Sequence, residues 1–453
     1  MQDPPSHHLF KIIYKINAFA LPISASGIIN MLSSFIAMMM IAQLGEVQLA
    51  AAALAVPTFI TIMTITATMF FAVGILISHH KGKENHPYEI GLVVKNGFWL
   101  ACFLWIPSAL ILWHIDKLLL VLGQEPKLVA LTHNYFHFTA LGMLPLMIVC
   151  VLTQFYLGVG NSRFSLIISI ISLPITVITS YGFILGHFGL PKLGLAGGAC
   201  AYLITQSVLL VVVVFIMYLR KSVHQYGIFN KPFMPKYSIC KSIFDLGMPV
   251  GIQFGTEIAA FTFSTYLLGY FGVVALASSQ IVNQYFMLVL MVTLGLAQAL
   301  TLFISQAYAK HDAKLINQYL YASLLTLIVY ALVATLFFIL FPAALIKFFI
   351  GKNTIDPALL HLTKIFFEIS CVVMFIDGAR HLLSGALRGF HDSQAPMRIG
   401  IIAMWLVSLP CCYLVGFTLN GGPIGLRIGF VTGFIFASLM LWLRIRKKLF
   451  HME

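Results

Sequence analysis

The sequence alternates between long apolar runs and short polar segments. Twelve runs are each about 20 residues or longer, the length that an α-helix needs to cross the hydrocarbon core of a bilayer. A strand of a membrane barrel needs only about ten residues of alternating polarity, so the runs predict helices. The expected spans are 17–43, 49–78, 92–114, 130–157, 164–186, 194–220, 244–269, 274–305, 316–346, 361–387, 397–418 and 423–444.

The composition agrees with an all-α membrane protein of about twelve transmembrane helices. Of the 453 residues, 60% are hydrophobic and 9% are charged, whereas soluble domains carry about 25% charged residues. The formal net charge of +13 comes from short loop clusters, which are not the contiguous basic face that nucleic acid requires. The seven cysteines are odd in number and lie mainly in apolar runs, so we expect small buried side chains and no disulfide framework.

The basic residues predict the orientation of the spans. If the N-terminus lies inside, roughly three times as many Lys and Arg fall in inner segments as in outer segments, as the positive-inside rule requires. An even number of spans then places both termini in the cytoplasm. We expect a multi-pass protein of the cell (inner) membrane, surrounded by lipid bilayer and monomeric, with no cofactor.

The second half of the chain repeats the first. A shift of 227 positions places Pro249 on Pro22 and Gly272 on Gly45, with no gap between them. Two copies of six spans point the same way through the membrane. Parallel repeats of this kind predict two pseudo-symmetric six-helix lobes around a central cavity, which is a transporter architecture. The expected parts are an N-terminal lobe at 1–221, a cytoplasmic linker at 222–241 and a C-terminal lobe at 242–453.

One carboxylate stands inside an apolar run of the second copy. Glu257 lies about ten residues into the expected span 244–269, where a charge is costly in hydrocarbon and therefore suggests a function. The first copy has Asn30 at the equivalent position. A charge that the fold required would be needed in both copies, so we predict that Glu257 is an oxygen ligand for Na⁺ or a proton carrier. The alternative is a permanently protonated Glu257, hydrogen-bonded within the bundle.

Three segments together resemble the multidrug and toxic compound extrusion (MATE) family, and the resemblance covers essentially the whole chain. They are Leu246 to Phe261, Ala277 to Ala299 with its A-S-S-Q-I-V-N-Q and G-L-A-Q-A runs, and Asp377 to Met397 with its D-G-A-R-H-L-L-S-G-A-L-R-G run. The resemblance implies an antiporter that exports organic, often cationic and amphipathic, compounds in exchange for inward Na⁺ or H⁺. Glu257 and Asp377 match the two carboxylates of a cation site in the family's C-terminal lobe. Asn283 matches a recurrent polar position of the eighth helix.

The first half departs from the common family pattern. Many relatives have an aspartate in helix one, where this chain has Ala37, and some have a second one in helix five, where this chain has Ser180 with Thr176 one turn earlier. The N-terminal lobe is therefore expected to hold no intramembrane carboxylate. A mechanism that depends on protonation of an aspartate in this lobe is in doubt for this chain.

Polar neighbours of the two carboxylates complete the candidate site. Arg380 follows Asp377 at i+3 on the same helix face, so it either pairs with Asp377 and neutralises it or points to the cytoplasmic end and leaves Asp377 free. Amide side chains that supply further oxygens, or serve only as hydrogen bonds between helices, are expected to line the cavity. These candidates are Gln253, Gln280, Asn283 and Asn30.

The predicted mechanism is antiport by competition. Binding of Na⁺ or H⁺ at Glu257 and Asp377 lowers the affinity for an organic cation, and each ligand weakens the other reciprocally. The alternative function is a lipid-linked oligosaccharide or polysaccharide flippase. Its pyrophosphate substrate requires several Arg or Lys side chains in the cavity, whereas we expect Arg380 alone there. The sequence shows no nucleophile–base or metal-ligand constellation, so we do not expect an enzyme.

Overall fold

The structure is a computed structural model that describes residues 5–84, 87–121, 124–229, 234–350 and 357–452. In these ranges the chain forms sixteen α-helices and two short π-helical segments, which confirms the predicted all-α class. Among the described residues, eleven continuous helical stretches are long and apolar enough to cross a membrane. Helix α9 (Tyr237–Gly269) is 33 residues long but less apolar, because its central part includes Gln253 and Glu257.

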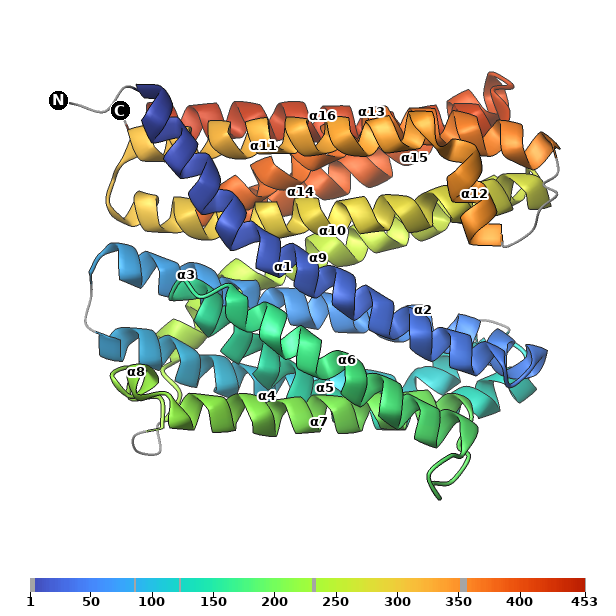
Figure 1. Cartoon of the computed structure of the whole chain (residues 1–453), viewed down its shortest axis with the longest axis horizontal. Coiled ribbons are helices and arrows are strands. Elements are labelled where there is room, and N and C mark those ends of the chain that lie inside the picture. The colour runs from blue at the N-terminus through green and yellow to red at the C-terminus, as the bar shows by residue number, and fades with distance from the viewer. Residues whose placement is uncertain (1–4, 85–86, 122–123, 230–233, 351–356, 453) are drawn as a thin grey trace. The chain divides into compact units, whose positions relative to one another are not determined.

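The helices follow the expected spans along the chain (Figure 1). The first half contains α1 (Pro5–Ala42), α2 (Glu46–Met69), α3 (Phe71–Gly82), α4 (Pro87–Val121), α5 (Pro126–Gly158), α6 (Arg163–Leu185), α7 (Leu195–Leu219) and the short α8 (Lys221–His224). The second half contains α9 (Tyr237–Gly269), α10 (Val273–Ala309), α11 (Ala313–Leu340), α12 (Pro342–Ile350), α13 (Pro357–Gly389), α14 (Gln394–Ile401), α15 (Leu409–Tyr413) and α16 (Gly422–Phe450).

The structure differs from the expected pattern in several segments. The expected spans 49–78 and 316–346 are each divided between two helices, α2 and α3 at Phe70 and α11 and α12 at Phe341. Helix α9 begins at Tyr237, inside the expected linker, because no proline or glycine follows Pro235 until Gly247 to interrupt a helix. The expected span 397–418 is built from α14 and α15 with π-helical turns at Ile402–Ser408 and Leu414–Thr418. Pro410, which has no N–H to donate, lies in α15 between the two π-helical turns.

The chain divides into two units, and the division falls inside two helices. The N-terminal unit is Ala25–Gly251, and the C-terminal unit combines Met1–Ser24 with Ile252–Glu453. The first part of α1 thus packs with the second half of the chain, and the first part of α9 packs with the first half. The shift of 227 positions places Gly251 on Ser24. The two exchanged segments, which are the first parts of α1 and α9, therefore end at equivalent positions of the internal repeat.

Close helix contacts explain where the exchanged segments pack. A Cβ at Gly295 of α10 would overlap Oγ of Ser24, which donates a hydrogen bond of 3.2 Å to the carbonyl of Val292. In the other unit, a Cβ at Gly247 of α9 would overlap the carbonyl oxygen of Met69 at the end of α2. Both contacts need a residue without a side chain, because the two backbones meet directly.

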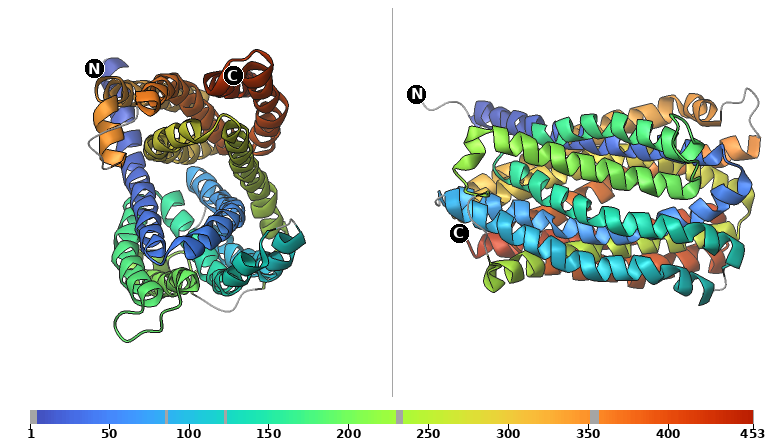
Figure 2. Two further views of the ribbon diagram at one scale, coloured as in Figure 1. Left: turned by 90° about the vertical axis from the view of Figure 1, so that its right-hand side faces the viewer. Right: turned by 90° about the horizontal axis from the view of Figure 1, so that it is seen from below.

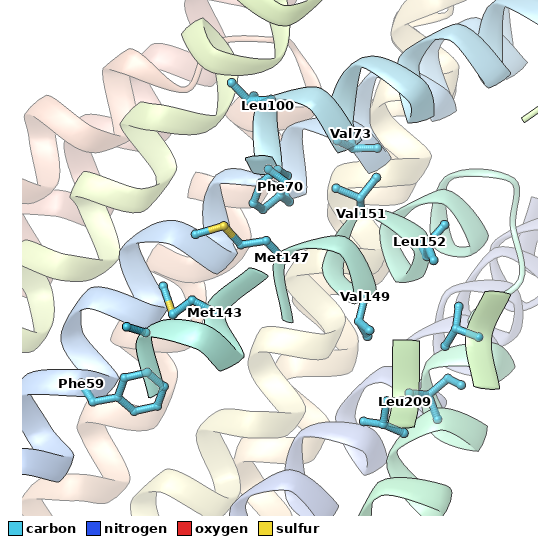
Figure 3. Close-up of a cluster of buried hydrophobic side chains, with 14 of the residues drawn as sticks. Phe59, Phe70, Val73, Leu100, Met143, Met147, Val149, Val151, Leu152 and Leu209 are labelled. Atoms are coloured by element: carbon cyan, nitrogen blue, oxygen red, sulfur yellow. The ribbon is translucent and has the colours of Figure 1, made fainter. Parts of the chain in front are cut away.

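The N-terminal unit has an apolar core around α5. This helix packs along both α4 and α7, and the three run beside one another in the right-hand view of Figure 2. Figure 3 shows the centre of the core, where Met143 and Met147 of α5 lie close to Phe59 and Phe70. Interdigitated side chains of this kind hold the helices in one arrangement.

The core of the C-terminal unit forms where α10 and α13 pack closely. Thr301 of α10 donates a hydrogen bond of 2.9 Å to the carbonyl of Gly385 on α13. A Cβ at Gly385 would lie 2.7 Å from the carbonyl oxygen of Ala297, so glycine allows this approach. Helix α13, which carries Asp377 and Arg380, is therefore fixed against its neighbour.

Candidate functional site

Three buried charges form one cluster in the C-terminal unit. Arg380 of α13 lies between Glu257 of α9 and Asp377, and all three side chains are nearly inaccessible to solvent. The guanidinium donates Nη1–H to Glu257 Oε1 at 2.5 Å, Nη2–H to Glu257 Oε2 at 3.3 Å and Nε–H to Asp377 Oδ1 at 2.8 Å. Arginine suits this position because its planar fork reaches two carboxylates at once.

The spacing of the charged and amide residues along α9 and α13 allows these contacts. Asp377 and Arg380 are three residues apart, which places both on one face of α13. Gln253 is one turn before Glu257 on α9 and donates Nε2–H to Glu257 Oε1 at 3.0 Å. The same carboxylate oxygen therefore accepts from an amide and from a guanidinium, which satisfies a charge that would be costly unpaired.

His381 is a fourth member of the cluster. Its Nε2 lies 2.9 Å from Arg380 Nη2 and 3.6 Å from Asp377 Oδ2. Because a guanidinium has no acceptor, Nε2 must accept the hydrogen bond, and the ring is neutral with its hydrogen on Nδ1. That Nδ1 is buried and has no hydrogen-bond partner among the described residues.

The charges of the cluster do not cancel by themselves. Glu257 and Asp377 contribute two negative charges and Arg380 one positive charge, so uptake of one cation would make the group neutral.

A second buried arginine, Arg388, lies two turns further along α13, where Nε donates to the carbonyl of Ser384 at 3.3 Å. Its guanidinium faces the ring of Phe254 at 5.5 Å, and Nη2 has no hydrogen-bond partner in the described part of the chain.

Of the two arrangements left open for Arg380, the structure contains the ion pair. The alternative, in which Arg380 points to the cytoplasmic end and leaves Asp377 free, is wrong for this structure. The physical reason is the cost of an uncompensated charge, because Arg380 has Glu257 and Asp377 within reach and would otherwise leave both unpaired. The predicted residues Glu257 and Asp377 are brought together, with the guanidinium between them.

The other predicted polar residues lie in different places. Gln253 contacts Glu257, whereas Asn283 of α10 accepts a hydrogen bond from Arg427 of α16 at 3.1 Å. Gln280 is exposed and lines none of the cavities described below. Asn30 lies in the N-terminal unit and lines its cavity.

The N-terminal unit contains a cavity of about 440 Å³. Ala37, Thr176 and Ser180, the positions singled out by the family pattern, all line it together with Asn30. The remaining lining is apolar, aromatic or hydroxyl-bearing apart from the amides of Gln154 and Gln206, and no described residue in it is charged. The volume falls within the range of roughly 300–1,000 Å³ that small-molecule sites occupy.

The C-terminal unit contains a smaller cavity of about 70 Å³ on the side of α16 that carries Arg427. Phe261, Phe430 and Phe434 form its floor, with the ring of Phe430 4.9 Å from that of Phe261. Phe434 also lies under Arg380, at 5.3 Å from the guanidinium carbon to the ring centre. Phe434 therefore borders both the cavity and the charge cluster.

Sequence reasoning missed three residues of these sites. His381 follows Arg380 directly and is four residues from Asp377, a spacing that places it on the same helix face as that carboxylate. The apolar pattern places Arg388 just beyond the expected span 361–387 and Arg427 near the start of the span 423–444, and both lie within membrane helices, α13 and α16. The available signal was a charged residue close to the end of an apolar run, which sequence alone also explains as a loop residue.

Comparison with known proteins places these observations in a family. The MatE family profile matches residues 22–182 and 249–414. The "Probable multidrug resistance protein NorM" of Rhizobium meliloti (strain 1021) is 30% identical over 406 residues, covering 89% of this chain and 86% of that protein. A protein of the same name from Brucella suis biovar 1 (strain 1330) is 26% identical over 417 residues, covering 91% and 88%.

Solved structures show the same fold. The "Crystal structure of MATE in the straight conformation" superposes with a TM-score of 0.87 at 18% identity and covers 97% of both chains. The "Outward-facing conformation of a multidrug resistance MATE family transporter of the MOP superfamily" gives 0.86 at 17% identity and covers 100% of both. The profile match over most of the chain and the 30% identity of the Rhizobium relative establish that this protein belongs to the MatE family of multi-pass membrane transporters.

Proposed function

We propose that this chain is a secondary active antiporter that exports organic, predominantly cationic and amphipathic compounds in exchange for an inward H⁺ or Na⁺. The observation that carries this proposal is the cluster of Glu257, Arg380 and Asp377. Within the described ranges, Glu257 and Asp377 are the buried carboxylates of the membrane helices. Relatives called multidrug resistance proteins support the export of organic compounds.

Ion coupling follows from the charge of the cluster. A proton on Glu257 or a Na⁺ beside it weakens the attraction between that carboxylate and Arg380. The guanidinium then keeps its bond to Asp377, while Gln253 keeps its bond to a Glu257 oxygen. The packing between α9 and α13 thus has two arrangements, selected by cation occupancy, and a substrate that prefers one of them is coupled to the ion.

The geometry favours H⁺ over Na⁺ as the coupling ion. A hard cation needs several oxygen ligands. Here Oε1 and Oε2 of Glu257 and Oδ1 of Asp377 already accept hydrogen bonds from Arg380. Na⁺ entry therefore requires the guanidinium to leave, whereas a proton needs only one oxygen with local rearrangement.

The cavity of the N-terminal unit supplies the place for the organic substrate in this proposal. Tyr135, Tyr202 and Phe59 line it, and their ring faces attract organic cations without a carboxylate. Met38 and Met63 add adaptable apolar surface, which suits substrates of varied shape. The flippase alternative lacks support, because this lining has no Lys or Arg for a pyrophosphate and Arg380 is already held by two carboxylates.

The test is flux of a fluorescent organic cation in proteoliposomes under an imposed pH gradient and, separately, an imposed Na⁺ gradient. We expect the pH gradient to drive flux in the wild type. Glu257→Gln and Asp377→Asn should abolish gradient-driven flux, whereas Glu368→Gln, an exposed carboxylate on the same helix as Asp377, should retain it. Full gradient-driven flux in Glu257→Gln would refute the proposed coupling.

A further inference from the structure

A further arginine of the membrane helices, in addition to Arg380 and Arg388, faces a cavity without a carboxylate. Arg427 is on the second turn of α16 and lines the cavity of about 70 Å³ in the C-terminal unit. Its Nη2 donates to Ser279 Oγ at 2.8 Å and to Asn283 Oδ1 at 3.1 Å, and both partners are neutral. The guanidinium carbon lies 4.4 Å from the centre of the Phe366 ring.

The contrast with Arg380 shows what Arg427 lacks. Arg380 has two carboxylates within 4 Å, whereas no carboxylate of the described residues lies within that distance of Arg427. The hydrogen bonds of Arg427 use Nη2 only, so Nη1 and Nε have no hydrogen-bond acceptor in the described part of the chain. A half-buried cation with unused donors at a cavity wall is an arrangement that attracts an anion.

The rest of the lining fits a small oxyanion. Ser264, Ser279 and Ser370 bring hydroxyl groups from α9, α10 and α13 to the same cavity. Asp and Glu do not occur among its described lining residues. A volume of about 70 Å³ is far below the roughly 300 Å³ at which sites for whole drug-sized molecules begin. The space suits a carboxylate group and the atoms next to it.

We propose that this cavity is an anion subsite in which Arg427 binds a carboxylate group of a transported molecule. This assignment deepens the proposed function and rests on it: the exported compounds then include zwitterions, whose carboxylate enters this cavity. The unused Nη1–H of Arg427 donates a hydrogen bond to the carboxylate, and Ser264 or Ser370 contacts the bound oxygen.

A binding experiment tests the subsite independently of transport. The purified full-length protein in detergent is heated with benzoate, with the neutral isostere benzamide or with sodium chloride, and its melting temperature is recorded. We expect benzoate to raise the melting temperature and benzamide to leave it unchanged, because a ligand that binds only the folded state stabilises it. Equal stabilisation by benzoate and benzamide, or stabilisation by chloride alone, would overturn the carboxylate assignment.

Two variants separate the subsite from effects on folding. Arg427→Gln removes the charge, and we expect benzoate affinity to fall at least tenfold. Asn283→Asp places a carboxylate beside the guanidinium, so it should block benzoate binding while it preserves the pairing of Arg427 and hence the fold. The control is Arg446→Gln, an exposed arginine on the same helix, which should bind benzoate like the wild type. Benzoate binding unchanged in both Arg427→Gln and Asn283→Asp would refute the subsite.

A transport experiment then connects the subsite to the substrate. A rhodamine dye with a free carboxylate and its methyl ester differ only in the group that Arg427 would bind. In proteoliposomes, Arg427→Gln should reduce transport of the free acid at least tenfold relative to transport of the ester. An equal effect on both dyes would contradict the subsite's role in transport, whereas failure of the wild type to move either dye would contradict the proposed function and leave the benzoate result standing.

Discussion

Replacement of Arg380 by glutamine tests the structural meaning of the charge cluster. The change removes the guanidinium that donates to both Glu257 and Asp377, and it leaves two carboxylates buried without a cation. Breaking a buried ion pair from one side costs about 3–5 kcal/mol, because the remaining charge is uncompensated. Here two carboxylates lose their partner, so we expect the upper part of that range at neutral pH.

The assay is thermal unfolding of the purified protein in detergent, followed by tryptophan fluorescence. A loss of about 4–5 kcal/mol corresponds to a fall of roughly 10 °C in the apparent melting temperature of a unit of this size. The triple variant Arg380→Gln, Glu257→Gln, Asp377→Asn removes all three charges together. Because a complete set of neutral hydrogen-bonding groups avoids the desolvation cost, this variant should recover most of the lost stability.

Two results would refute the reasoning about the cluster. The first is an Arg380→Gln variant that melts like the wild type, since the guanidinium would then contribute nothing to the fold. The second is a triple variant as unstable as the single one, since the damage would then come from lost packing and not from unpaired charge. In either case Arg380 could not act as the internal cation of the cluster.

Three further predictions concern other parts of the chain. Gly295→Ala should lower the free energy of unfolding by about 1–3 kcal/mol, because the new methyl group overlaps Ser24, whereas Gly198→Ala, with only side-chain carbons 3.5 Å or more away, should be tolerated in the same melting assay. Burial raises the pKa of Asp392, whereas the cations of α16 lower it. The net result is a pKa below the ordinary value of this carboxyl group. The wild type should therefore be more stable than Asp392→Asn above roughly pH 4, and melting measured against pH should show the difference vanish as the pH falls below the lowered pKa. Ser180→Asp places a carboxylate in the N-terminal cavity, so equilibrium binding should show higher affinity for a permanently charged organic cation and no gain for a neutral analogue.

Much of the fold was predictable because the signal is long and periodic. Apolar runs of about 20 residues give the transmembrane helices, and the shift of 227 positions gives the two copies. The sequence does not predict that α1 and α9 change packing partners at Ser24 and Gly251. Each helix is continuous there, and no residue pattern indicates the change. Only two glycines hint at it: Gly295, against which the exchanged part of α1 packs, and Gly247, which lies on the exchanged part of α9.

The candidate site was predictable in its carboxylates but not in its pairing. Glu257 stands out against Asn30 in the other copy, and Asp377 lies in a recognisable motif. Whether Arg380 bridges them depends on the distance between α9 and α13, which the sequence does not encode locally. Arg427 escaped notice for a similar reason: its cavity is formed by four helices, and each contributes only one or two of the polar groups.

The measurement that tests the central claim most directly is ion movement driven by substrate. Liposomes containing the purified protein and a pH-sensitive dye receive a gradient of an organic cation, with no imposed ion gradient. We predict that the wild type moves protons against the direction of substrate flow and that Glu257→Gln moves neither above the rate of empty liposomes. Proton movement of equal size in both proteins, or substrate flux with no accompanying H⁺ or Na⁺, would contradict the account.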